Sequence, residues 1–144
     1  MGEGLHAVDF FGWTIQQAEL LREGRIDEID REHLAEEIED MGKSLQRELV
    51  SRLTILFIHL LKWQFQRGYQ GNSWRYTIEE QRDQLSDHLQ DNPSLKQKIP
   101  QAMERAYKYA RTGAARETGL PKSTFPEDCP WLFDQALDGA FWPT

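Results

Sequence analysis

The acidic segment EHLAEEIEDM, from Glu32 to Met41, holds the side chains whose types and spacing first suggest chemistry. On a helix, His33, Glu37 and Asp40 share one flank, because they are spaced at i, i+4 and i+7. Imidazole and carboxylate groups are metal ligands, but two neighbouring ligands do not complete a site, and the helix dipole also favours acids in a first turn. We therefore treat these three residues as weak metal candidates and expect no cofactor.

The other acids of this segment are expected on the solvated face of the same helix. Apolar residues recur every three or four positions from Leu34 onward, which is the spacing of a buried helical stripe. Glu32, Glu36 and Glu39 project to the side opposite this stripe, so we assign them no chemical role. The residues expected to form the buried stripe are Leu34, Ile38, Met41, Leu45, Leu49, Leu56, Leu60 and Trp63.

Three polar residues further along the same helix fall close to the centre of this stripe, provided that the helix continues past Gly42. Glu48 and Arg52 are spaced to form an ion pair, and His59 follows two turns later. One interpretation is a hydrogen-bonded structural cluster, because polar groups on a buried face need partners. The other is a pocket that binds an acidic small molecule through arginine donors and a proton acceptor. The residues expected to build this candidate pocket are Glu48, Arg52, His59, Trp63, Trp74 and Arg75.

Several enzyme classes lack the residue patterns that they require. A di-metal carboxylate bundle needs a Glu-x-x-His motif on each of two facing helices, and the sequence does not supply two. A thiol nucleophile is disfavoured, because Cys129 lies beside Asp128 and neighbouring acid raises a thiol pKa. No Gly-x-Ser-x-Gly elbow or phosphate-binding glycine loop is present.

Length and composition fit one ordinary globular domain. With 144 residues, of which 39% are hydrophobic and 28% charged, we expect a single helical domain over residues 1–144, with residues 1–8 as an N-terminal tail. The single cysteine excludes an intramolecular disulfide, and no apolar run suits a membrane helix or a signal peptide. We expect a soluble, cytoplasmic protein with no membrane partner. The net charge of −7 argues against a nucleic acid partner.

The charges are unevenly distributed along the chain. Residues 1–40 hold twelve acidic against three basic residues, whereas residues 96–122 hold seven basic against two acidic residues. We prefer the interpretation that the two halves attract each other across a helical bundle. The alternative is that the basic segment binds an external anion.

Apolar residues recur at helical spacing from end to end, and no segment shows the alternation of a strand. We therefore predict an all-α fold, a compact bundle of about five or six helices around one long central helix. The predicted segments are a helix from Asp9 to about Arg22, the long helix from Asp30 to about Gln66, a helix capped by Asn72 or Ser73 that ends before Pro93, a helix beginning near Pro100, an ordered loop from Gly119 to Pro130, and a short helix from Trp131 to about Leu137. Gly42 leaves two alternatives for the long helix, which either continues through this residue or is kinked or broken there.

Several motifs, in order along the chain, together resemble a known protein family. They are LAEEIEDMGKS, LFIHLLKWQF, SWRYTIEEQR, ETGLPKSTFPEDCPW and the terminal FWP. The family is bacterial, abundant in cyanobacteria, and catalogued as domain of unknown function family twenty-nine. The likeness runs from Asp9 to Pro143 and implies a compact helical domain of this length. It implies no activity, ligand or catalytic residue.

Two functions from different classes are consistent with these patterns. The first is a non-catalytic binding or protein-interaction module that forms a homo-oligomer or binds a protein partner through exposed aromatic residues. The second is an enzyme or small-molecule-binding protein that uses the candidate pocket. The aromatic residues that we expect a small bundle to bury incompletely are Trp131, Phe133, Phe141 and Trp142.

Overall fold

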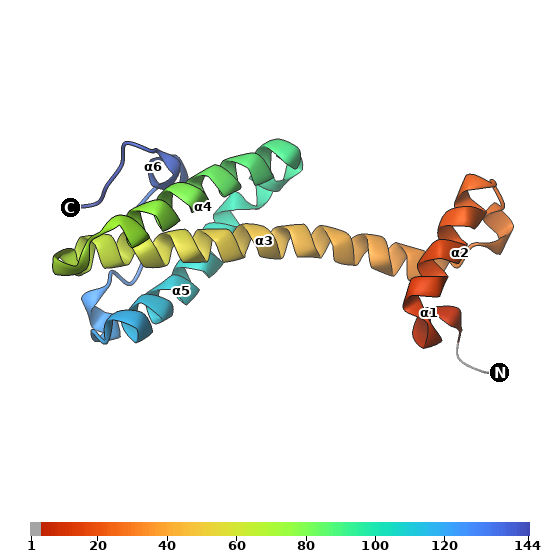
Figure 1. Cartoon of the computed structure of the whole chain (residues 1–144), viewed down its shortest axis with the longest axis horizontal. Helices are drawn as coiled ribbons and strands as arrows, with labels where there is room; N and C mark the ends of the chain where they lie inside the picture. Colours follow the sequence, from red (N-terminus) through yellow and green to blue (C-terminus); the bar gives the residue numbers. More distant parts are fainter. Residues whose placement is uncertain (1–3) are drawn as a thin grey trace. The chain divides into compact units, whose positions relative to one another are not determined.

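The computed structural model describes residues 4–144, and in that range it contains six α-helices and no β-strand (Figure 1). The predicted all-α fold with one long helix is confirmed. The helices are α1 (Leu5–Val8), α2 (Phe10–Arg22), α3 (Arg31–Phe65), α4 (Asn72–Asp91), α5 (Ile99–Thr118) and α6 (Phe133–Leu137). The chain forms two compact units, which we call the N-terminal unit (Met1–Lys43) and the C-terminal unit (Ser44–Thr144). Each is described by itself, and the expected single domain stays a prediction.

Helix α3 confirms the predicted long helix and shows no break at Gly42. Its 35 residues run without interruption from Arg31 to Phe65. A glycine inside a helix costs roughly 1 kcal/mol relative to alanine, which a helix with many other hydrogen bonds and packing contacts tolerates. Of the alternatives left open at Gly42, the structure shows a helix without a break, because helical propensity at one residue is outweighed by the residues on either side.

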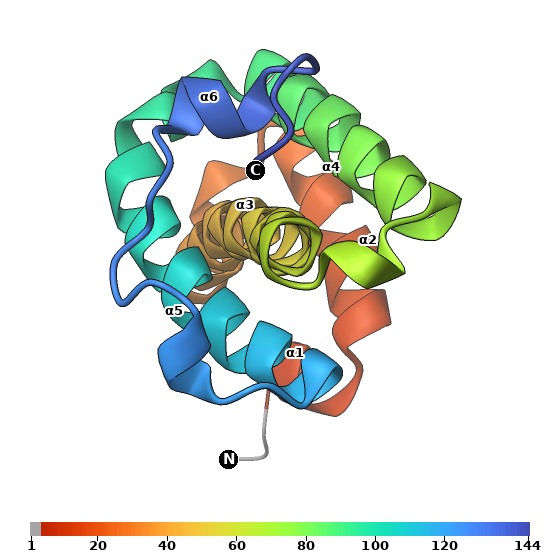
Figure 2. The same ribbon diagram turned by 90° about the vertical axis from the view of Figure 1, so that its left-hand side faces the viewer.

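The C-terminal unit is built around the second half of α3. Figure 2 looks along this helix and shows α4, α5 and α6 around it. Helix α5 presents a face of small residues to the core, as predicted, and Gly113 on that face meets Ile58 so closely that an added Cβ would lie 2.7 Å from the Ile58 Cδ1 atom. The α3 side chains with no exposed surface are Leu49, Leu53, Leu56, Phe57, Leu60 and Leu61.

The N-terminal unit holds α1, α2 and the beginning of α3. As predicted, the Asp9 carboxylate accepts a hydrogen bond from the Gly12 N–H and caps α2. Residues Leu5–Val8 were expected in the tail but form α1, where His6 packs edge-on against Trp13. The first three residues of the expected tail lie outside the described range.

The first half of α3 does not bury the stripe that the sequence predicted. Ile38 and Met41 are each 64% exposed, and Leu45 is also exposed, whereas Leu49 and the residues after it are buried. Within the N-terminal unit, α2 meets α3 on another flank, because Trp13 donates to Asp30 and packs beside His33. The predicted apolar stripe exists on the helix, but within the N-terminal unit Leu34 is only half-buried and Ile38 and Met41 are left uncovered.

The start of α4 also differs from the prediction. Asn72 and Ser73 were expected to cap this helix, but both are already helical, and the preceding Gly71 makes no side-chain capping bond. The end of α4 before Pro93 is confirmed, and so is the start of α5 near Pro100.

The segment after α5 is ordered, as predicted, and is held by backbone carbonyls. Phe125 and Trp131 are buried, and the Tyr107 hydroxyl donates to the Pro126 carbonyl at 2.6 Å. Cys129 is half-buried in this segment, and burial raises the pKa of its thiol. Further along, the short helix predicted from Trp131 begins at Phe133.

A buried arginine on α4 holds the end of the chain. Arg82 is 5% exposed, its Nε donates to the Ala136 carbonyl at 2.8 Å, and its Nη2 donates to the Phe141 carbonyl at 2.6 Å. The guanidinium also lies over the Trp142 ring, 5.2 Å from its centroid. One side chain therefore ties α4 to α6 and to the segment that follows it.

We expect Arg82→Ala to lower the free energy of unfolding by about 2–3 kcal/mol, because two carbonyls would lose a charged donor in a buried place. It should also make residues 136–144 sensitive to proteolysis. The matched control is Arg75→Ala on the same helix, which removes an exposed arginine and should change stability by no more than about 0.5 kcal/mol. Chemical denaturation and limited proteolysis measure both effects, and equal losses in the two variants would contradict the role given to Arg82.

Candidate functional site

The structure brings Glu48 and Arg52 together and adds a histidine that the sequence analysis missed. Arg52 Nε donates to Glu48 Oε1 at 3.1 Å, and His88 Nδ1 lies 3.2 Å from Glu48 Oε2. His88 Nε2 donates to the Leu45 carbonyl at 2.9 Å, so both ring nitrogens of this buried histidine face oxygen atoms. Its position three residues after Leu85, on the buried face of α4, was a signal that could have identified it.

His59 does not join this group. Its Nδ1–H donates to the Ile55 carbonyl at 2.8 Å, one turn back on α3. Burial is the main cause that lowers its pKa, and nearby Lys62 lowers the pKa further. Lys62 in turn lies 3.3 Å from Glu117 on α5, so His59 sits beside an ion pair that joins two helices.

The tryptophans of the candidate pocket face different partners. Trp63 packs against Trp142 with ring centroids 4.6 Å apart. The Lys62 ammonium lies over the Trp74 ring, 4.9 Å from the ring centroid. Arg75 is exposed to solvent. Only Glu48 and Arg52 of the six candidate pocket residues therefore form a bonded pair.

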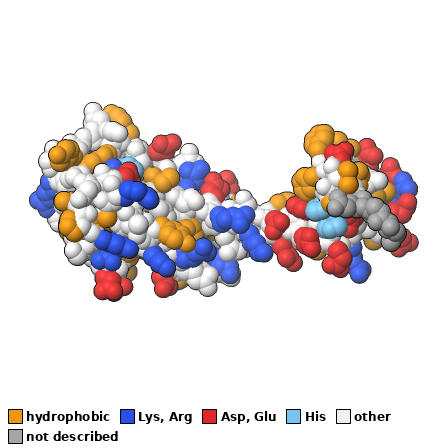
Figure 3. Space-filling view, turned by 90° about the horizontal axis from the view of Figure 1, so that it is seen from below, with side chains coloured by type: hydrophobic (Ala, Val, Ile, Leu, Met, Phe, Trp, Pro, Cys, Tyr) orange, Lys and Arg blue, Asp and Glu red, His pale blue; other side chains and the backbone are white. Residues whose placement is uncertain are grey.

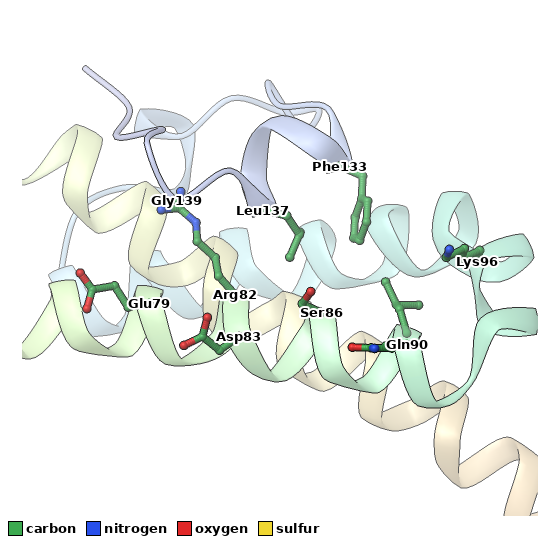
Figure 4. A pocket seen from close by; sticks show the side chains of 10 residues that line it. Glu79, Arg82, Asp83, Ser86, Gln90, Lys96, Phe133, Leu137 and Gly139 are labelled. Carbon is green, nitrogen blue, oxygen red and sulfur yellow. The ribbon is translucent and has the colours of Figure 1, made fainter.

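A cavity of about 760 Å³ lies between α4 and α6 in the C-terminal unit (Figure 4), and none of the six candidates lines it. Ser86 and Gln90 face it from α4, with Leu137 across from them on α6. Acidic side chains, Glu79 and Asp83, lie near Arg82. No histidine or cysteine lines the cavity, and its charged lining residues are Glu79, Arg82, Asp83 and Lys96.

Two histidines of the N-terminal unit stack face to face. The rings of His6 and His33 are 4.0 Å apart and 5° from parallel. His6 Nε2 pairs with Glu37 at 2.7 Å, and His33 Nδ1 donates to Asp30 at 2.7 Å. Two imidazole–carboxylate pairs therefore lie against each other.

The hydrogen bond between His33 and Asp30 shifts the pKa of both groups. The hydrogen bond to Asp30 is the main cause that raises the pKa of His33, and the same bond is the main cause that lowers the pKa of Asp30. Of the weak metal candidates, His33 and Glu37 thus bind different partners, and Asp40 is exposed. Over residues 4–144, no group of three or more His, Cys, Asp or Glu side chains is arranged to hold a metal ion.

The N-terminal unit also exposes many large apolar side chains. Trp13 and Gln17 are the only buried residues among positions 4–43. Figure 3 shows hydrophobic side chains on the surface of this unit, with acidic side chains around them. The exposed apolar residues of the N-terminal unit are Leu5, Val8, Phe10, Phe11, Ile15, Leu21, Ile26, Ile38 and Met41.

Three of the four C-terminal aromatic residues stay incompletely buried, as predicted. Phe133, Phe141 and Trp142 are half-buried and packed against the core, whereas Trp131 is buried. Arg82 binds the backbone on both sides of Gly139 and holds this segment against α4. The exposed aromatic residues are Phe10 and Phe11 in the N-terminal unit and Tyr69, Tyr76 and Tyr109 in the C-terminal unit.

Comparison with known proteins places this chain in a family. The family described as Domain of unknown function DUF29 matches residues 5–142. The chain belongs to this family. The match covers nearly the whole chain and confirms the resemblance drawn from its motifs. Searches of curated proteins and of solved structures find no match. Among residues 4–144, no helix has the length and apolar character that a membrane span requires.

Arg52→Ala should lower the free energy of unfolding by no more than about 1 kcal/mol, because Glu48 is 40% exposed and keeps His88 as a partner. The sequence alone would place Glu48 in the core and give a larger loss. His88→Ala is the comparison, and we expect a loss of about 2 kcal/mol, because it removes a buried ring, its hydrogen bond to the Leu45 carbonyl and its contact with Glu48. Urea denaturation of both variants checks this order, and a larger loss for Arg52→Ala than for His88→Ala would contradict it.

The pKa of His33 should lie above the ordinary histidine value of about 6.5, and Asp30→Asn should return it toward that value. Because this pKa is raised, the stability from the pair is fully present below the ordinary value and is lost as pH rises through the raised pKa. NMR titration of the ring protons measures it. His59 is an internal reference, because its pKa should be shifted in the opposite direction. A His33 pKa unaffected by Asp30→Asn would contradict this account.

Proposed function

We propose that the protein is a non-catalytic protein-interaction module whose N-terminal unit supplies the binding surface. The observation that carries this proposal is the exposure of Ile38 and Met41, which lie on an apolar stripe that continues into the core of the C-terminal unit. Single exposed apolar residues are normal, whereas a series of them at helical spacing marks a surface that another helix can cover.

The size of the apolar surface also supports an interaction role. Among positions 4–43, nine large apolar residues are exposed, including Phe11 at 75%. Aromatic and methionine side chains are enriched in protein interfaces, and Phe10, Phe11 and Met41 supply both types. Contacts with another protein would remove this apolar area from water and stabilise the complex.

The polar candidates give less support to a catalytic function. Glu48 contacts both Arg52 and His88, while His59 donates to a backbone carbonyl. Each of these groups has a structural partner, and none lines the cavity beside α6. An enzyme would need reacting groups that converge on one space.

We also propose a class of partner and a cellular compartment for this protein. The acidic surface of the N-terminal unit disfavours nucleic acid, so we propose a protein partner. The single cysteine fits the reducing cytoplasm that the sequence analysis expected.

A direct test uses a fluorescent synthetic helix with leucines on one face and lysines on the other, measured by fluorescence anisotropy in high salt to screen charges. The protein should bind this probe. Ile38→Gln together with Met41→Gln should weaken binding at least about 10-fold, because apolar contact area is lost without a change of charge.

Leu132→Gln is the matched control, because it removes a more exposed apolar side chain from the C-terminal unit. This variant should bind the probe as the unchanged protein does. Equal binding by all three proteins, or no binding together with no self-association, would overturn the proposed function.

A further inference from the structure

We infer that the first half of helix α3 binds a second copy of this chain, through an antiparallel pairing of the two α3 helices. This inference rests on the proposed function, because it names the occupant of the same surface. Its first support is the small core of the N-terminal unit, in which Trp13 and Gln17 are the only buried residues among positions 4–43. Units of roughly 40 residues usually need a disulfide, a metal or association to be stable. The unit has no cysteine, and association would bury the apolar side chains that it exposes.

The exposed stripe on α3 has the spacing of a two-helix interface. We call Leu34, Ile38, Met41 and Leu45 the α3 seam. Its members are four, three and four residues apart, which is the spacing of the a and d positions in a coiled coil. Ile38 and Met41 at its centre are each 64% exposed, so a second helix has room to pack there.

The seam is complementary to itself when two copies run in opposite directions. An antiparallel pair centred between Ile38 and Met41 places each of these residues opposite the other in the second copy. Leu34 then lies opposite Leu45 in both directions. The same surface is used by both copies, so the contact closes on a two-fold axis and does not extend into a fibre.

Small residues on one flank of the seam allow the helices to approach closely. Ala35 and Gly42 occupy the same flank one heptad apart, and in the antiparallel pair each faces the other across the interface. A Cβ added at Gly42 would meet nothing within 4 Å, so open space lies over this part of the helix. The distance between packed helices depends on the side chains at the contact, and small ones shorten it.

The other flank avoids contact between like charges. It carries Glu37 and Ser44, which face each other across the antiparallel interface. The Glu37 carboxylate of one copy therefore faces the Ser44 hydroxyl of the other copy. It is already paired with His6 within its own unit before the two copies associate.

The surrounding charges favour the antiparallel direction. Glu32 and Glu36 lie near the start of α3, while Lys43 and Arg47 lie further along it. In the antiparallel pair, the acidic start of one helix runs alongside the basic positions of the other. A parallel pair would place the two acidic starts together. At separations near the Debye length of about 10 Å this charge pattern selects direction more than it adds affinity.

Sedimentation velocity of the full chain over a concentration series tests the inference. The protein should form a dimer, and Ile38→Gln with Met41→Gln should raise its dissociation constant at least about 100-fold, because each change acts in both copies. Leu132→Gln should leave the dissociation constant unchanged. Circular dichroism shows whether each variant keeps its helices.

Gly42→Gln supplies a test with effects of opposite sign. A better helix former at this exposed position should raise the thermal stability of α3 at low protein concentration. The longer side chain should weaken the dimer, because it keeps the two helices apart. A variant that is both more stable and more dimeric would contradict the close approach at Gly42.

Cross-linking tests the direction of the helices. In a Cys129→Ser background, Ala35→Cys and Gly42→Cys should each form little disulfide alone, whereas a mixture of the two single variants should form disulfide-linked dimers. A parallel pair would keep these positions of the two copies on opposite flanks of the seam, so the mixture would form no more disulfide than the single variants do. That result would overturn the antiparallel arrangement.

The outcomes separate this inference from the proposed function. A chain that stays monomeric yet binds the leucine–lysine probe through Ile38 and Met41 would overturn the second copy as partner and leave the interaction module supported. A dimer that tolerates the Ile38 and Met41 changes would overturn the inference as well, because another surface would then form it.

Discussion

The burial of one apolar face of α3, from Leu49 to Leu61, is the constraint on which the C-terminal unit depends. Six side chains on this face have no exposed surface, and α4, α5 and α6 each contribute to covering them. The small residues of α5 then become necessary, because a bulkier face could not approach α3 as closely as Gly113 does. The same helix continues outside this core, where Ile38 and Met41 of its apolar stripe are left uncovered within their own unit.

Three buried side chains of the C-terminal unit bind backbone carbonyls. Arg82, His88 and Tyr107 donate to carbonyls that lie outside their own helix. Such bonds satisfy groups that would be costly to bury alone, and they also fix the position of loops that have no regular structure. The polar residues that look suited to chemistry therefore position the chain, which is why so few of them face open space.

Helical periodicity predicted the fold well but could not show which helices meet. The boundaries of α2 and α3 were predicted almost to the residue, because capping by Asp9 and Asp30 and the spacing of apolar residues are local signals. The exposure of Ile38 was not predictable, since the stripe has the same spacing where it is covered and where it is free. His6 was also missed as the partner of Glu37, because the two are 31 residues apart and only the fold joins them.

The half-buried thiol of Cys129 can report on local opening of the segment between α5 and α6. Its sulfur lies 3.5 Å from the Trp131 carbonyl, in the segment between α5 and α6. A thiol whose pKa is raised by burial reacts slowly with electrophiles while the segment is closed. Opening of the segment would expose this thiol fully and remove the burial that raises its pKa, so the rate of thiol labelling rises with the population of the locally unfolded form. Labelling of this single cysteine therefore reports the release of the C-terminal end of the chain.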